Sequence, residues 1–83
     1  MKIEVKQEHI DKGIRYKCDA CPVALAIKEQ INPHGLIVRN NIIIKLKSTS
    51  KIMVLFIPKK AQTFIMSFDA LRKVEPFVFD LAI

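Results

Sequence analysis

Apolar and charged residues alternate at the start of the chain, and this pattern predicts a short β-strand. In "KIEVK", residues 2–6, Ile3 and Val5 fall on the same face of such a strand. The next segment, "QEHIDKGI", predicts one or two turns of helix that end at Gly13, because glycine is common just beyond the last turn of a helix. "RYKCD" then connects this turn to a longer helix.

The clearest helical pattern spans residues 21–31. Its apolar positions recur at intervals of three and four and form one stripe, composed of Val23, Ala24, Ile27 and Ile31. Pro22 suits the first turn, where its missing N–H group is not needed, and Pro33 cannot continue the helix. We therefore expect a helix whose first two turns are deeply buried.

Three aliphatic segments follow, separated by "NN" and "STS". They predict a three-stranded antiparallel meander over residues 36–39, 42–47 and 51–57. The pair Asn40 and Asn41 fits a tight hairpin turn, because asparagine tolerates the left-handed backbone conformation that such turns require.

Pro58 ends the meander and begins a second amphipathic helix, predicted over residues 59–72. Its apolar stripe comprises Ala61, Phe64, Ile65, Phe68 and Leu71. The C-terminal segment "PFVFDLAI" alternates apolar and other residues and therefore predicts a final strand. The residues expected to face the core from this strand are Phe77, Phe79, Leu81 and Ile83.

These elements follow the order β-α-α-β-β-β-α-β. We expect an α+β fold in which helices pack on one face of an antiparallel sheet. Residues 1–83 are enough for a single compact domain, and there is no repeat or linker that would divide them. About half of the residues are apolar, which supplies one core and argues against disorder.

Four blocks of the chain, "QEHIDKG", "CPVALAI", "FIMSFDA" and "VEPFVFDL", resemble a family of very short, functionally uncharacterised proteins of tailed phages and their bacterial hosts. This resemblance implies a phage or prophage origin, but it implies no activity and no site residues. The family usually has a glycine turn after the block that ends at Ala70, whereas this chain has Leu71. We therefore expect the helix to continue to about Arg72.

Neither the N-terminal segment nor the apolar runs of the sequence indicate a membrane location. "MKIEVKQEH" lacks the apolar stretch of a signal peptide. The longest apolar runs, "VALAI" and "IMVLFI", are far shorter than the roughly 20 residues that span a bilayer. We expect a soluble protein of the bacterial cytoplasm, without a membrane partner and without a disulfide framework.

Cys18 and Cys21 admit three interpretations: a zinc site, a redox pair, or the start of a helix. A zinc site needs two further ligands, and the two histidines, His9 and His34, are not paired in sequence. A thioredoxin-like pair has a proline between its cysteines, whereas Pro22 follows both of them here. We favour burial of Cys21 under the helix start, and we expect both histidines at the surface.

No catalytic set can be assembled from the sequence. It has no Ser/His/Asp group and no inward pair of carboxylates, and its two glycines cannot form a phosphate-binding loop. We therefore expect neither an enzyme nor a protein with a bound cofactor.

The meander gives the strongest indication of function. Its expected core face comprises Leu36, Val38, Ile42, Ile44, Leu46, Ile52, Val54 and Phe56. The opposite face combines an apolar centre with a basic rim and comprises Ile37, Ile43, Met53, Leu55 and Ile57 with Arg39, Lys45, Lys47 and Lys51. Such a combination is typical of interaction surfaces. The leading hypothesis is a non-enzymatic protein that binds a host or phage protein, or itself, through this face, unless a helix or the last strand covers it.

Self-association through the meander is expected to be weak or moderate. A symmetric dimer would cover the apolar patch with its own copy. It would also bring the lysines of the two copies together, so the dimer should tighten as salt screens them.

The alternative function is nonspecific nucleic-acid binding through the basic segment 30–68. The formal net charge is +6, and no acidic residue occurs between Glu29 and Asp69. With Phe56 expected in the core, the open face of the meander has no aromatic ring for base stacking. Eleven lysines against three arginines favour phosphate contacts over base recognition.

Overall fold

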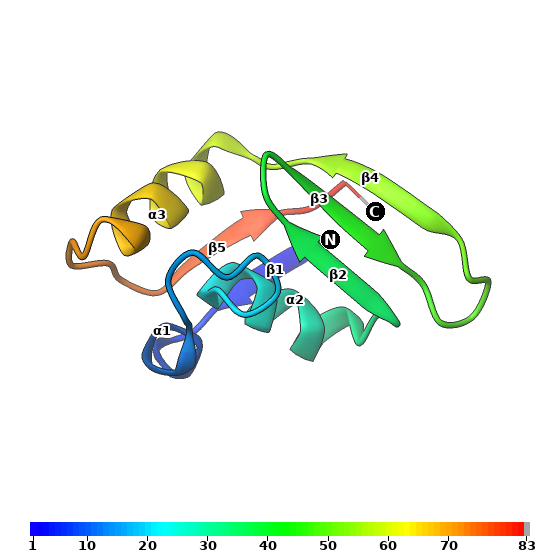
Figure 1. Cartoon of the computed structure of the whole chain (residues 1–83), viewed down its shortest axis with the longest axis horizontal. Helices are drawn as coiled ribbons and strands as arrows, with labels where there is room; N and C mark the ends of the chain where they lie inside the picture. Colours follow the sequence, from blue (N-terminus) through cyan, green and yellow to red (C-terminus); the bar gives the residue numbers. More distant parts are fainter. Residues whose placement is uncertain (83) are drawn as a thin grey trace.

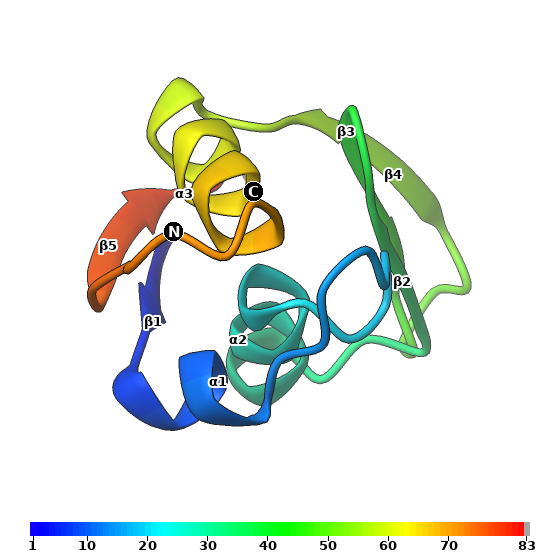
Figure 2. The same ribbon diagram turned by 60° about the vertical axis from the view of Figure 1, so that its left-hand side comes forward.

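The first and last strands of the chain form one antiparallel sheet, and the three central strands form another (Figure 1). The computed structural model describes residues 1–82, which contain five strands and three helices. Their bounds are β1 (Lys2–Val5), α1 (Gln7–Lys12), α2 (Pro22–Ile31), β2 (Gly35–Val38), β3 (Asn41–Lys45), β4 (Ile52–Phe56), α3 (Lys59–Asp69) and β5 (Phe77–Asp80). In Figure 2, α2 and α3 lie between the two sheets, and α1 lies beside α2.

The predicted α+β class, the order of the elements and the antiparallel pairing of the strands are confirmed. The strands divide between two sheets because β1 pairs with β5, with Ile3 opposite Phe79. Reciprocal hydrogen bonds extend this pairing, since the Met1 amino group and the Leu81 N–H each donate to the other residue's carbonyl oxygen at 2.8 Å. Helices therefore cover one face of each sheet, and the core lies in the layer between the sheets.

The core contains the apolar faces that the sequence predicts for the first strand, the long helix and the last strand. The largest fully buried residues are Ile3, Val5, Pro22, Val23, Ile27, Ile42, Ile44 and Leu81. Burial of each large aliphatic side chain contributes roughly 1.5–3 kcal/mol to folding. The predicted inward position of Ile83 lies outside the described residues.

Side chains and turns define both ends of α2. The Cys21 sulfur accepts a hydrogen bond from the Ala24 N–H at 3.4 Å, and Pro22 is the first helical residue. At the other end, Asn32 adopts a left-handed conformation with φ of 52°, and its N–H donates to the Lys28 carbonyl oxygen at 2.9 Å. The predicted start and end of this helix are thus confirmed, and each has a local chemical cause.

Helix α3 ends at Asp69, so its predicted extension to Arg72 is wrong. Leu71 adopts a left-handed conformation with φ of 64°. Its N–H donates to the Phe68 carbonyl oxygen at 3.2 Å, and the Arg72 N–H donates to the Ser67 carbonyl oxygen at 2.9 Å. These are the hydrogen bonds of a Schellman motif, which satisfy the last carbonyl groups of a helix. They outweigh the roughly 1–2 kcal/mol that a left-handed leucine costs relative to glycine.

Candidate functional site

An apolar surface covers the side of the β2-β3-β4 sheet that faces away from the helices. Its members are all exposed, and we call them the outer apolar face: Ile37 on β2, Ile43 on β3, and Ile52, Val54 and Phe56 on β4. Val54 lies opposite Ile43, which lies opposite Ile37, so one apolar row crosses the whole sheet. Phe56 is 91% exposed, and Ile52 and Val54 are each 63% exposed. Contiguous apolar exposure of this kind marks interaction surfaces.

Two residues predicted on this face, Met53 and Leu55, lie on the opposite side of the sheet, and the prediction is wrong for them. Met53 pairs with buried Ile44, and Leu55 pairs with buried Ile42. Paired residues in an antiparallel sheet share a face, so both side chains are directed toward the core. Ile57, just after the strand, is also buried. Because every residue of β4 is apolar, alternation alone fits either orientation, and only the pairing register decides between them.

The basic residues predicted as a rim are all exposed, but only part of the set borders the outer apolar face. Lys45 lies on the outer side of β3, and Arg39 follows the end of β2. The ammonium group of Lys47 is instead 3.3 Å from the Asn32 side-chain oxygen at the end of α2. Lys51 lies at the turn between β3 and β4. The rim therefore consists of Arg39 and Lys45, with Lys51 next to one end of β4.

The exposed position of Phe56 reverses one argument from the sequence. Ile52, Val54 and Phe56 were expected to face the core, and their exposure shows that this expectation is wrong. The outer apolar face therefore does contain an aromatic ring, the feature whose expected absence argued against nucleic-acid binding.

A half-open cavity of about 460 Å³ lies between the α1–α2 loop, the β2–β3 turn and α3. Val38 and Ile57 contribute to its apolar lining, and Arg39 and Asp69 contribute charges of opposite sign. Tyr16 also lines it, with φ of 60°, and its N–H donates to an Asp69 carboxylate oxygen at 3.2 Å. Sequence reasoning missed this cavity, because its loop residues match no binding motif and were interpreted only as a connector.

The structure supports a structural role for the cysteine at the start of α2. Cys21 is buried, as expected, and burial raises the pKa of its thiol, which reduces the reactive thiolate. The Cys18 carbonyl oxygen accepts a hydrogen bond from the Val38 N–H at 2.7 Å, so Cys18 links the α1–α2 loop to β2. Within residues 1–82, the only cluster of three potential metal-ligating side chains is Glu8, His9 and Glu29. Neither cysteine belongs to that cluster.

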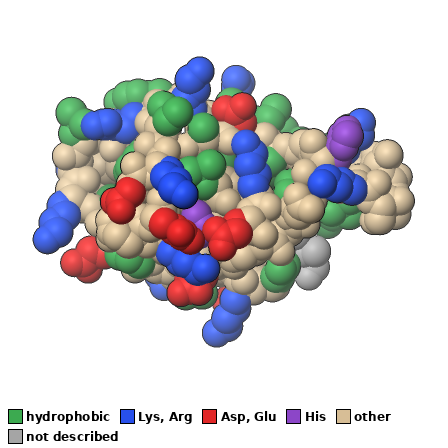
Figure 3. All heavy atoms as spheres, turned by 90° about the horizontal axis from the view of Figure 1, so that it is seen from below, with side chains coloured by type: hydrophobic (Ala, Val, Ile, Leu, Met, Phe, Trp, Pro, Cys, Tyr) green, Lys and Arg blue, Asp and Glu red, His purple; other side chains and the backbone are tan. Residues whose placement is uncertain are grey.

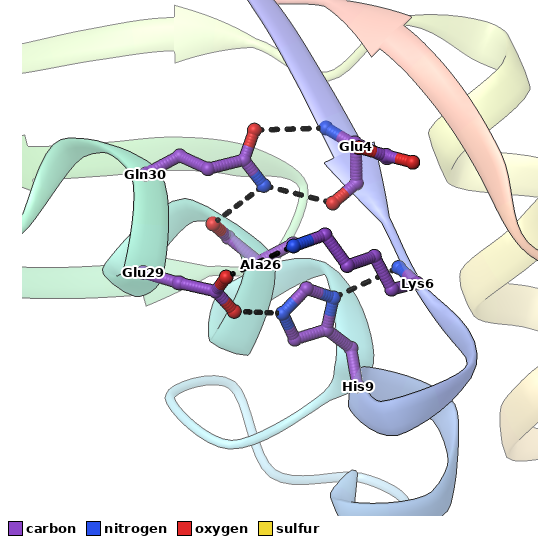
Figure 4. A network of polar contacts seen from close by, with 6 residues as sticks. All are labelled: Glu4, Lys6, His9, Ala26, Glu29 and Gln30. Carbon is purple, nitrogen blue, oxygen red and sulfur yellow. Dashed lines mark hydrogen bonds and ion pairs between the residues drawn. The ribbon is translucent and has the colours of Figure 1, made fainter.

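His9 is only 4% exposed, so its expected position at the surface is wrong. Figure 4 shows its imidazole between two partners. Nδ1 accepts the Lys6 N–H at 2.9 Å, and Nε2 lies 2.5 Å from a Glu29 carboxylate oxygen. Because Nδ1 is an acceptor, Nε2 carries the ring proton and donates a hydrogen bond to Glu29. His34, by contrast, is exposed as expected.

The carboxylate of Glu29 links several elements. Hydrogen bonds from His9 and then from Lys6 lower the pKa of Glu29, and the same carboxylate raises the pKa of Lys6, whose ammonium lies 3.3 Å away. Beside it, the Gln30 amide donates to the Glu4 carbonyl oxygen at 2.8 Å and accepts the Glu4 N–H at 3.0 Å (Figure 4). These contacts join β1 and α1 to α2. Sequence spacing gives no sign of them, because the partners lie far apart in the chain.

Charge is unevenly distributed over the surface. Figure 3, which views the molecule from below, shows acidic side chains gathered on the side where α1 and α2 lie. The meander contributes only basic charge, because no acidic residue occurs between Glu29 and Asp69. The charges that the meander itself contributes around the outer apolar face are therefore all positive, which favours anionic partners.

Comparison with protein-family models, with curated proteins and with solved structures finds no match for this chain. The resemblance of its four blocks to short phage proteins stays a prediction. None of the helices in residues 1–82 is long and apolar enough to cross a bilayer.

Proposed function

We propose that this protein is a non-enzymatic interaction module of phage type, which binds a host or phage protein in the bacterial cytoplasm through the outer apolar face. The observation that carries the proposal is the exposure of five apolar side chains on three adjacent strands. Leaving such a surface in water is unfavourable, and covering it with a partner removes that cost.

The charge around this face indicates the kind of partner. Arg39 and Lys45 border it, and Lys51 lies at the adjacent turn. A partner with apolar side chains surrounded by acidic ones matches this arrangement, and its binding should weaken as salt rises. Self-association through the same face has the opposite salt dependence, because it brings like charges together.

The test is a single charge placed in the middle of the face. Val54→Lys should leave the fold intact, because the side chain is exposed, and should abolish capture of the partner by the tagged protein from bacterial extract. Val78→Lys is the matched control, since Val78 is an exposed valine on the other sheet. Equal capture of the same identified partner by Val54→Lys and by the unsubstituted protein would argue against the proposal.

A second candidate function is nonspecific binding of single-stranded nucleic acid, and the exposure of Phe56 favours it. An exposed ring on a face that also carries Arg39 and Lys45 can stack on a base while these cations contact phosphates. Binding of a labelled oligothymidylate should then weaken steeply with salt, and Phe56→Ala should weaken it further. If the Phe56→Ala variant binds the oligothymidylate as tightly as the unsubstituted protein, Phe56 gives no support to nucleic-acid binding.

A further inference from the structure

We propose that the free edge of β4 binds an extended, acidic peptide segment, which adds to the β2-β3-β4 sheet as a fourth strand. This inference rests on the proposed function in one respect, namely that the partner is a protein. It adds the backbone conformation of the bound segment, its charge, and the part of the sheet that it contacts.

The direction of the backbone groups of β4 follows from the hydrogen bond that closes the β3–β4 turn. The Leu46 N–H donates to the Lys51 carbonyl oxygen at 3.0 Å. In an antiparallel pair, hydrogen-bonded positions alternate, so the N–H and C=O groups of Met53 and Leu55 are directed toward β3. The corresponding groups of Ile52, Val54 and Phe56 are therefore directed away from β3, and we call these three the free-edge residues.

Two other sheet edges, those of β2 and β1, are covered by hydrogen bonds from the rest of the chain. On β2, the outward Val38 N–H donates to the Cys18 carbonyl oxygen. On β1, the Gln30 amide bonds both the N–H and the C=O of Glu4 (Figure 4). Each of these edges already has a built-in partner from the α1–α2 loop or from α2.

The edge of β4 has no such cover. Among the described residues, no hydrogen bond reaches the outward groups of the free-edge residues, and Figure 1 shows β4 at the margin of its sheet. The strand also contains no charged residue and no proline. Proteins usually protect an exposed edge with one of these features, so a bare apolar edge indicates a site for strand addition.

The side chains of the free-edge residues also lie on the outer apolar face. A strand added beside β4 would place its alternate side chains next to Ile52, Val54 and Phe56, where apolar or aromatic pairs are favourable. The same contact would reduce the exposure of Phe56.

The charge next to β4 selects an acidic occupant. Lys51 precedes the strand, and Lys59 follows it at the start of α3. An added segment with acidic residues at both ends therefore meets a cation at each end of the strand. A second copy of this chain is a poorer occupant, because each copy has a formal net charge of +6.

The test uses a fluorescent peptide of alternating valine and threonine with two aspartates at each end. We expect it to bind the full chain, to bind less tightly at high salt, and to lose binding when lysines replace its aspartates. N-methylation of alternate residues along one edge of the peptide should also abolish binding, because it removes the amide donors that pair with β4.

Val54→Pro removes one outward N–H of β4 and should weaken binding roughly tenfold or more, whereas Val54→Thr, which keeps the N–H, should not. If Val54→Pro does not fold, the N-methylated peptide tests the same hydrogen bonds. Equal binding of the methylated and unmethylated peptides would overturn the proposal, and so would a tightly formed dimer that excludes the peptide.

Ile43→Lys separates this proposal from the proposed function, because Ile43 lies on the outer apolar face but on the central strand β3. If the peptide does not bind while Ile43→Lys abolishes capture of the partner, the edge proposal fails and the proposed function stands. If the peptide binds and Ile43→Lys leaves partner capture unchanged, binding at the edge stands and the role of the face fails.

Discussion

The Nε2 of His9 on α1 lies 2.5 Å from a carboxylate oxygen of Glu29 on α2. The other ring nitrogen accepts the Lys6 N–H, so one buried imidazole satisfies a backbone donor and orients a carboxylate on a neighbouring helix. This arrangement fixes the tautomer of the ring and holds the first helix against the second.

Replacing His9 by phenylalanine should reduce the free energy of unfolding by about 1–3 kcal/mol, because the partly buried Lys6 N–H loses its acceptor and Glu29 loses one of its two donors. Urea unfolding measures this loss. His9→Asn should lose less, since its side-chain oxygen can replace Nδ1. His34→Phe is the control on an exposed histidine and should change stability by less than about 0.5 kcal/mol. An equal loss at both positions would contradict the structural role of His9.

Glu29 should make stability depend on pH in the acid range. Its pKa in the folded protein is lowered, chiefly by the hydrogen bond from His9 and then by the one from Lys6. The contribution of Glu29 to the free energy of unfolding is therefore fully present above the ordinary pKa of glutamate. It is lost as the pH falls through the lower pKa of the folded protein. Urea unfolding at a series of pH values should show a shallower acid loss for Glu29→Gln. Glu75→Gln, at an exposed position outside this network, should keep the slope of the unsubstituted protein.

Leu71→Gly should stabilise the protein by about 0.5–1 kcal/mol. Glycine removes the strain of the left-handed conformation, part of which is offset by its greater freedom in the unfolded chain. Little burial is lost, because Leu71 is 73% exposed. Thermal unfolding should therefore show a rise of about 2–8 °C in the midpoint. Leu71→Ala keeps a side chain at the same φ and should give no such rise; a similar gain from both variants would point to another cause.

The two cysteines should differ in their reaction with a thiol reagent at neutral pH. Cys21 is buried and its pKa is raised by that burial, so it should react only when the protein unfolds. Cys18 is half-buried and should react first. Cys18→Ser and Cys21→Ser isolate each thiol, and absorbance of the released dye gives the rates. Rapid labelling of Cys21 in the folded Cys18→Ser protein would contradict the assigned burial.

The sequence was sufficient to predict an element and its buried side where the apolar pattern fitted only one arrangement. The stripe that includes Val23 and Ile27 could pack only as one face of a helix, and Pro22 could occupy only its first turn. The terminal strand was equally clear, since Phe79 alternates with polar Asp80. For these elements local chemistry and tertiary packing agree, so periodicity identifies both the element and its buried side.

The sequence was insufficient where the outcome depended on residues far apart in the chain. In β4 both sets of alternate residues are apolar, so the register with β3, rather than composition, decided that Val54 and not Met53 faces outward. The partner of buried His9 is Glu29 on α2, which is 20 positions away in the chain, so only the packing of α1 against α2 brings them together. The strands of the meander were therefore predicted correctly, whereas the faces assigned to the side chains of β4 were wrong.

The pairing of β1 with β5 has a consequence for the protein during its synthesis. β1 leaves the ribosome before its strand partner, Phe77–Asp80, has been synthesised. At about 5–20 residues per second, β1 waits several seconds without that partner. During this time Ile3 and Val5 cannot be fully enclosed, and the nascent chain presents them to chaperones and proteases. A ribosome that stalls before residue 77 should therefore release a chain that is rapidly degraded.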